Sequence, residues 1–132
     1  MIRLLLAITL CFMTSLTSWA NTDRYEIPLA GNAYELGHSG RRSTVHQAGA
    51  KISAADKKTT AVYFKVLGTG NIQVKLKGTA AFAAKLKVRF LGKNKTVSFK
   101  PTTKEIDLGS FKVKSAGYLT LELSSLLGDV DV

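Results

Sequence analysis

The sequence predicts an all-β protein built as an antiparallel β-sandwich, and three observations support this. Hydrophobic and polar residues alternate with a period of two along most of the chain after residue 60, as they do in strands with one buried face. Turns rich in glycine, asparagine and proline separate these stretches at short intervals, which is typical of sandwiches and barrels. No segment combines a helical period with helix-capping residues.

The first 20 residues are expected to be a cleaved secretory signal peptide. Arg3 gives a basic start, and the apolar run at residues 4–13 is shorter than the roughly 20 residues that span a bilayer. Small residues then lead to a cleavage site after Ala20. Residues 21–132 are expected to form one β-sandwich domain that is secreted or periplasmic. This domain has no cysteine, no membrane span and a formal charge of +9, which is the +10 of the whole chain less Arg3.

The beginning of the domain predicts little regular structure. Residues 25–29 can form a strand, which Pro28 would confine to an edge or a bulge. Residues 31–60 are rich in Gly, Ser and Ala and are expected to be a long loop with a short strand within 45–52. A loop of this length is often functional.

The rest of the domain predicts a regular succession of strands. Phe64, Phe90, Phe99 and Phe111 take inward positions and are the candidate core aromatics. The last strand is expected to lie beside the first. The alternation places strands at residues 61–66, 72–77, 85–90, 97–99, 106–108, 111–113, 118–123 and 129–132, and turns at 68–71, 92–95, 100–103, 109–110 and 115–117.

Several stretches resemble a bacterial domain family of unknown function. They are YEIPLAGNAYELG near the start, AVYFKVLGTGNIQVKLKG and KLKVRFLGKNKTVSFK in the middle, and KEIDLGSFKVKSAGYLTLELSSL near the end. Such domains are similar to jelly-roll carbohydrate-binding modules and usually precede a larger uncharacterised domain in secreted proteins. The resemblance therefore implies a jelly-roll-like sandwich, and possible contact with a larger partner domain or protein.

A basic stripe is the first candidate site. In an antiparallel sheet its members can share one solvent face, which Lys65, Lys112 and Lys114 can extend, and would then form a platform for an acidic glycan. The alternative is an ordinary solvated face, on which lysines also block pairing of strand edges. Nucleic acid is not expected, because most aromatic residues take inward positions. The stripe consists of Lys75, Lys77, Lys85, Lys87 and Arg89.

The long loop carries the second candidate site. Tyr34 offers an aromatic face for a sugar, and Arg41 or Arg42 can bind a carboxylate or sulfate through two hydrogen bonds. The alternative is a polar loop with Tyr34 packed on the sandwich.

Metal binding has weaker support. His38 and His46 lack a third ligand at a characteristic spacing. The resemblance to jelly-roll modules implies a possible structural calcium between the first and last strands, where Glu26, Asp129 and Asp131 could supply oxygen ligands. The alternative is that these are ordinary surface acids, and no other cofactor is expected.

The sequence contains no familiar catalytic motif. It lacks a nucleophile elbow, a P-loop and a zinc-protease motif, and Cys11 leaves with the signal peptide. Glu105 and Asp107 would share a face of one strand, but nothing builds a glycosidase site around them. We therefore expect an exported, non-catalytic binding module for a glycan, with acidic glycans among the candidates. The alternatives are an envelope protein that binds a protein or lipid partner, and a remnant or subunit of a hydrolase.

Overall fold

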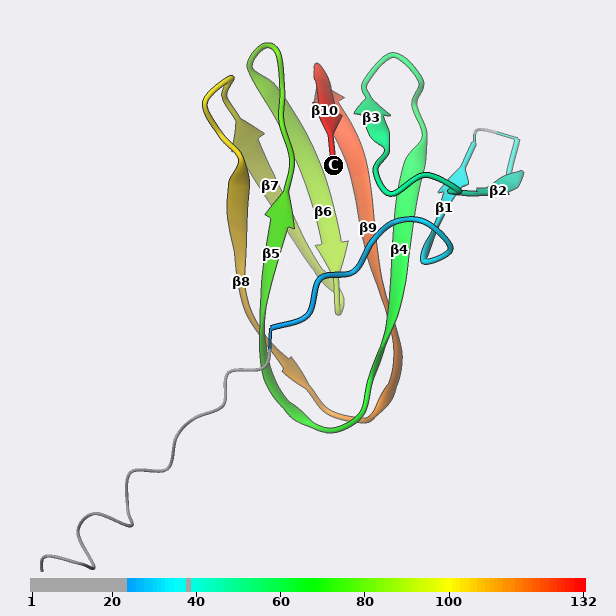
Figure 1. The fold of residues 1–132 in the computed structure, drawn as a ribbon, viewed down its shortest axis with the longest axis vertical. Coiled ribbons are helices and arrows are strands. Elements are labelled where there is room, and N and C mark those ends of the chain that lie inside the picture. Colours follow the sequence, from blue (N-terminus) through cyan, green and yellow to red (C-terminus); the bar gives the residue numbers. More distant parts are fainter. Residues whose placement is uncertain (1–23, 38) are drawn as a thin grey trace, which may run out of the picture.

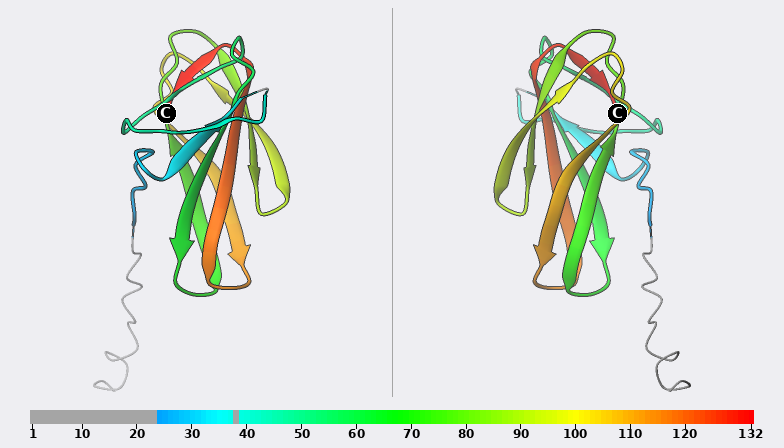
Figure 2. Two further views of the ribbon diagram at one scale, coloured as in Figure 1. Left: turned by 90° about the vertical axis from the view of Figure 1, so that its right-hand side faces the viewer. Right: turned by 90° about the vertical axis from the view of Figure 1, so that its left-hand side faces the viewer.

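Ten antiparallel strands build the part of the chain that the computed structural model describes, residues 24–37 and 39–132, and no helix occurs there. The strands pack as two layers around an apolar interior, so the predicted antiparallel β-sandwich is confirmed (Figures 1 and 2). The strands are β1 (Ala33–Leu36), β2 (Arg42–Thr44), β3 (Lys51–Ser53), β4 (Thr59–Val66), β5 (Gly70–Lys77), β6 (Ala84–Phe90), β7 (Lys93–Phe99), β8 (Glu105–Val113), β9 (Gly117–Leu127) and β10 (Asp129–Asp131).

One layer is a six-stranded sheet in the order β2-β1-β4-β9-β6-β7. The other, called the second layer here, holds two strand pairs, β5 with β8 and β10 with β3. A single antiparallel bridge between Thr79 and Asp131 connects β10 to the chain that follows β5. The end of the chain thus joins the two pairs, and the second layer runs β8, β5, β10, β3 across the front of Figure 1.

The interior follows from the alternation of side chains. Leu86, Val88 and Phe90 on β6 are almost fully buried, whereas the residues between them point to solvent. The ring of Phe90 lies 5.9 Å from that of Phe64 on β4 and meets that of Phe111 on β8 edge-on at 4.9 Å. The second contact crosses between the layers and therefore ties the two sheets together.

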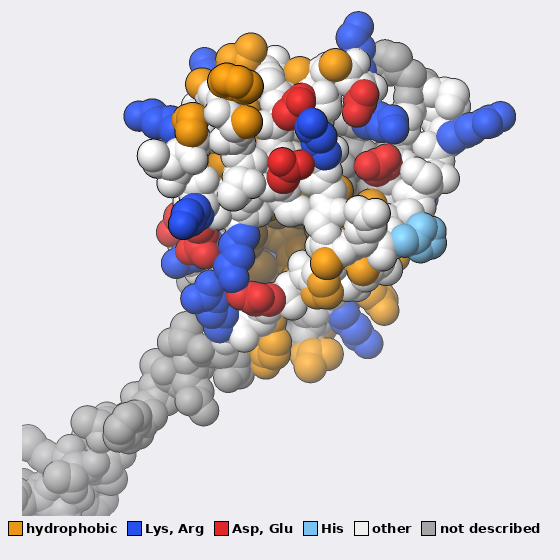
Figure 3. All heavy atoms as spheres, turned by 45° about the horizontal axis from the view of Figure 1, so that its top comes forward, with side chains coloured by type: hydrophobic (Ala, Val, Ile, Leu, Met, Phe, Trp, Pro, Cys, Tyr) orange, Lys and Arg blue, Asp and Glu red, His pale blue; other side chains and the backbone are white. Residues whose placement is uncertain are grey.

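The second layer covers the core incompletely. Phe64, Ile72 and Leu119 face the interior but stay only half-buried. In the view of Figure 3, a hollow opens between the surface side chains and shows hydrophobic atoms at its floor.

The beginning of the domain differs from the prediction. Residues 25–29 form no strand: Pro28 has no N–H to give, and Leu29 is instead held by a hydrogen bond from its N–H to the carbonyl oxygen of Ala48 (3.2 Å). Residues 31–60 are not one long loop, because β1, β2 and β3 lie within them. A small apolar cluster anchors this region to the six-stranded sheet; its buried members are Leu29, Ala33, Val45 and Val62.

The last strand is present but has a different neighbour from the one predicted. β10 pairs with β3 instead of with the start of the domain. The predicted signal peptide lies outside the described residues. Within those residues, no helix is long and apolar enough to cross a membrane.

The junction in the second layer yields a stability prediction. A Cβ atom on Gly78 would lie 2.9 Å from the carbonyl oxygen of Asp131 and 3.3 Å from the ring of Phe99. Gly78→Ala should therefore push β10 away and lower the free energy of unfolding by about 1–3 kcal/mol in urea denaturation. Gly68→Ala is the matched control, because a Cβ there meets nothing within 4 Å. Equal stability of the two variants would contradict close packing of Gly78 against β10.

The β6–β7 turn yields a second stability prediction. Leu91 and Gly92 connect the strands with φ angles of 47° and 75°. Two positive φ angles are typical of a type I′ turn, which favours Asn-Gly and disfavours leucine. Leu91→Asn should raise the free energy of unfolding by about 0.5–1 kcal/mol in urea denaturation. Leu67→Asn, at an exposed leucine without positive φ, should change it little, and a fall in stability for Leu91→Asn would argue against strain at the turn.

Candidate functional site

The predicted basic stripe does not lie on one face. Lys75 and Lys77 belong to β5 in the second layer, whereas Lys85, Lys87 and Arg89 belong to β6 in the six-stranded sheet. Each set points away from the interior, and the two layers pack with their inner faces together, so the sets lie on opposite outer faces. The prediction of one continuous platform is wrong because β5 and β6, although consecutive in sequence, lie in different layers.

Carboxylates neutralise the half of the stripe on β5. Lys75 Nζ lies 3.5 Å from Glu105 Oε1 on β8, and Lys77 forms an ion pair with Glu26. Glu26 is fully exposed, and the hydrogen bond and charge of Lys77 lower the pKa of its carboxyl. Asp107 also lies on this face, where hydrogen bonds from the backbone of Gly109 and then from Gln73 lower its pKa. These acids offset much of the positive charge of this outer face, to which Lys112 on β8 also contributes.

The three residues of the stripe on β6 retain more of their positive charge. Arg89 lies 3.8 Å from Glu122 on β9, which is exposed enough for the pair to be weak. Among the described residues, no carboxylate reaches salt-bridge distance of Lys85 or Lys87. Lys87 faces Ser124 on β9 and Thr96 on β7 instead.

Three tyrosines share this outer face of the six-stranded sheet. Tyr34 lies opposite Ala61, which takes the same outward side of β4 as Tyr63. Tyr118 on β9 lies opposite Lys65, the next outward residue of β4. Because directly paired residues point to the same side of a sheet, the three rings and the cations of β6 face the same solvent.

Tyr34 and Arg42 meet, as predicted, but on paired strands instead of a loop. The Arg42 guanidinium lies over the Tyr34 ring, 4.9 Å from its centre, in cation–π geometry. The Tyr34 ring is 6.1 Å from that of Tyr63, whose hydroxyl donates a 2.6 Å hydrogen bond to the carbonyl oxygen of Gly31. These contacts fix both rings against the sheet and cover Ala61, which is 3% exposed although it points outward.

Tyr118 is the most accessible ring of this face. It is 72% exposed, and Lys65 Nζ lies 6.0 Å from its ring centre. The sequence prediction of sites omitted Tyr63 and Tyr118 and gave Lys65 only as a possible addition to the stripe. These residues could have been found from the sequence, because the alternation on β4 and β9 already placed Tyr63, Lys65 and Tyr118 on the outward side.

Arg41 lies just before β2 and is exposed, and it makes no contact with Tyr34 that matches that of Arg42. The nearby hollow of about 430 Å³ lies on the other side of β1 and β2, where Glu35, His46 and Asp56 contribute to its lining. Tyr34 and Arg42 therefore do not lie in a cleft.

The predicted calcium ligands do not come together. Glu26 is engaged with Lys77, and Asp129 lies 3.3 Å from Lys51 and has its pKa lowered by hydrogen bonds from Ser53 and Lys51. In the described part of the chain, no three His, Cys, Asp or Glu side chains form a group that could hold a metal ion. His38 falls outside the described residues.

The sequence of this sandwich matches the family described as "Domain of unknown function (DUF5077)" over residues 27–129. The chain belongs to this family. The match contains β1 to β9 and thus the whole outer face of the six-stranded sheet. No curated protein matches the chain. The resemblance to a domain family of unknown function is confirmed, while the kinship with carbohydrate-binding modules stays a prediction.

The Glu26–Lys77 pair yields a titration prediction. The pKa of the Glu26 carboxyl lies below its ordinary value of 4.5, chiefly through Lys77. Its contribution to stability is therefore present above pH 4.5 and is lost as the pH falls through the lowered pKa. Lys77→Gln should raise the pKa of Glu26 toward 4.5 in an NMR titration of the side-chain carboxyl, while Lys87→Gln should leave it alone. An unchanged Glu26 pKa in Lys77→Gln would show that Lys77 is not engaged.

Proposed function

We propose that the protein is a non-catalytic module that binds an acidic glycan across the outer face of the six-stranded sheet. One observation carries the proposal: among the residues that the structure describes, this face combines three tyrosines and five cations with a single carboxylate. The tyrosines are Tyr34, Tyr63 and Tyr118, the cations are Arg42, Lys65, Lys85, Lys87 and Arg89, and the carboxylate is Glu122.

Aromatic side chains on a rigid sheet suit the flat apolar faces of sugar rings. Tyr118 offers its exposed ring, and Tyr63 is held in place by its hydrogen bond to Gly31. Fixed rings lose little conformational entropy on binding, so the favourable free energy of their contact with a ligand is not cancelled by the cost of ordering side chains. A strand surface positions such groups more firmly than a mobile loop does.

The cations select the charge of the ligand. Lys65 lies beside Tyr118, so a sugar on that exposed ring would place its carboxylate or sulfate within reach of Lys65. Arg42 covers the Tyr34 ring and would bind a further acidic group of the glycan. Lys85 and Lys87 extend the positive surface to the far side of the sheet. On the outer face of β5 and β8, Glu26, Glu105 and Asp107 offset the lysines, and this face serves as an internal comparison.

Other features agree with this proposal. The expected signal peptide would deliver the module to the periplasm or the outside, where polysaccharides are plentiful, and the sandwich architecture is shared with jelly-roll carbohydrate-binding modules. Association with a larger domain or protein would supply the activity that a binding module serves. The module itself is proposed to need no cofactor and no structural calcium.

An envelope interaction protein is the second candidate, and an apolar patch supports it. Phe82 is 82% exposed, and Leu126 and Leu127 are 54% and 53% exposed. They lie at the same end, because a Cβ on Gly128 would be 3.1 Å from the carbonyl oxygen of Ala83. Figure 3 shows hydrophobic side chains gathered at the end that carries the β5–β6 connection, with Lys and Arg beside them. Such a patch suits a protein or lipid partner.

Affinity electrophoresis tests the proposed glycan site. Gels containing polygalacturonate should retard the protein, and gels containing dextran should not. Lys85→Gln/Lys87→Gln should lower the affinity for polygalacturonate, measured from the retardation, roughly ten-fold, since each exposed charge contact contributes up to about 1 kcal/mol. Tyr118→Ala should also weaken it, because the accessible ring is lost.

Lys75→Gln/Lys77→Gln is the matched control, because it removes two lysines from the face on which acids pair with them. Equal effects of the two double variants would mean non-specific attraction and would overturn the site. Retardation by single-stranded DNA stronger than by polygalacturonate would replace the glycan with nucleic acid. The absence of retardation in every gel would leave the interaction protein as the better account.

A further inference from the structure

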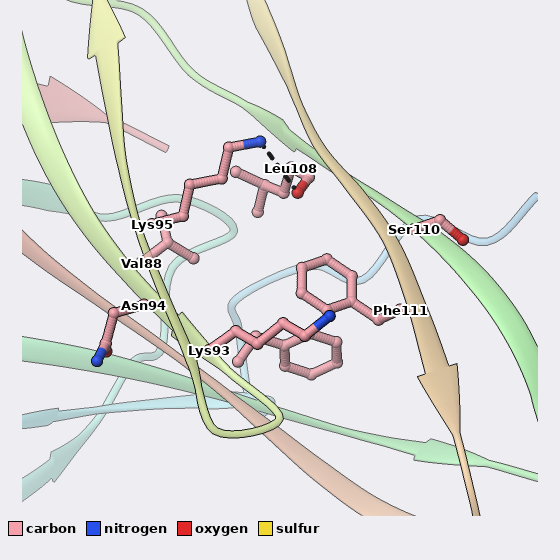
Figure 4. A pocket seen from close by; sticks show the side chains of 8 residues that line it. Val88, Lys93, Asn94, Lys95, Leu108, Ser110 and Phe111 are labelled. Atoms are coloured by element: carbon pink, nitrogen blue, oxygen red, sulfur yellow. Dashed lines mark hydrogen bonds between the residues drawn. The ribbon is translucent and has the colours of Figure 1, made fainter.

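A small cleft opens between the β6–β7 hairpin and β8, away from the face proposed for glycans. Its volume is about 220 Å³, and its walls are the side chains of Val88, Phe90, Leu108 and Phe111 (Figure 4). Figure 2 shows the hairpin leaning away from β8 toward its turn, and the cleft lies between the two. The two layers thus part at the edge formed by β7 and β8, where few contacts join them.

Two lysines lie at this opening because of the register in which β7 pairs with β6. Lys93 lies opposite Phe90, and Lys95 lies opposite Val88, so both point to the inner side of the sheet. The following residues on that side, Val97 and Phe99, are buried. Inward lysines on an edge strand can simply prevent pairing with other chains.

The contacts of the two ammonium groups indicate a role in addition to edge protection. Lys93 Nζ lies 5.9 Å from the centre of the Phe111 ring, and Lys95 Nζ donates a 3.3 Å hydrogen bond to the carbonyl oxygen of Leu108. No carboxylate in the described part of the chain forms a salt bridge with either lysine. Asp107 is near enough for Lys95 to lower its pKa slightly, but its Oδ1 already accepts hydrogen bonds from Gln73 and Gly109.

We propose that this cleft binds a small amphiphilic anion. An aromatic ring or short acyl chain would lie against Phe111 and Val88, and a carboxylate or sulfonate would be held by Lys93 and Lys95. The size is suitable, because an apolar protein cavity of about 150 Å³ accommodates benzene. An apolar pocket with a few convergent polar groups is the usual form of a small-molecule site. The site is independent of the proposed glycan face, since it lies on the opposite side of β6 and β7.

Binding of 4-phenylbutyrate to the protein tests this inference, with 4-phenylbutanol as the uncharged probe. NMR titration should move the backbone signals of residues 88–95 and 108–111, and the acid should bind roughly ten-fold more tightly than the alcohol. Lys93→Gln/Lys95→Gln should remove this preference. Lys93→Arg/Lys95→Arg should keep it, and this variant also guards against loss of edge protection in the glutamine variant.

Lys85→Gln/Lys87→Gln is the matched control, because it removes two charges from the outer side of the same hairpin and should leave binding intact. The proposal is overturned by equal affinity for the acid and the alcohol. It is also overturned by signal changes confined to other parts of the chain, or by a control variant that weakens binding as much as Lys93→Gln/Lys95→Gln does.

Discussion

The whole structure depends on the aromatic contact between the two layers. Phe90 on β6 packs against Phe64 on β4 within its own sheet and meets Phe111 of β8 edge-on at 4.9 Å. Once Phe64 and Phe90 face the interior, the period of two fixes the side to which every other residue of β4 and β6 points. Lys87 and Arg89 must then point to solvent, and so must Tyr63 and Lys65. The core thereby determines which side chains the surface offers to a ligand.

The same constraint gives the sandwich two outer faces of different character. On β5 and β8, acids lie opposite or beside Lys75 and Lys77 and offset their charge, as in the pair of Lys75 with Glu105. On the six-stranded sheet, serine and threonine face Lys87, and tyrosine rings take positions beside Arg42 and Lys65. The positive charge of the protein is thus distributed unevenly, and only one face combines it with aromatic rings. This difference supports directed binding more than general solubility.

Sequence reasoning succeeded where a strand has one well-buried side. It located β4 to β7 and β9 within a few residues and identified Phe64, Phe90, Phe99 and Phe111 as inward. It wrongly divided β8 into two strands with a turn at 109–110, because Gly109 lies within that strand with a φ angle of 102°. It missed β1 and β2, because β2 is exposed throughout and β1 has four residues of which only one is buried, so neither strand shows clear alternation. It also failed to separate Lys75 from Lys87, since alternation reveals the side of a strand but not the sheet that it joins. Glu26 and Lys77 are 51 positions apart, and only the folded chain brings them together.

The central claim is that the outer face of the six-stranded sheet is the binding surface. An NMR titration of the protein with a short oligogalacturonate tests it most directly. The account predicts that the largest changes in backbone signals fall on β4, β9 and β6 around Lys65, Tyr118 and Lys87, while β5 and β8 change little. Changes centred on Lys75 and Lys112, or spread evenly over every exposed lysine, would contradict the account.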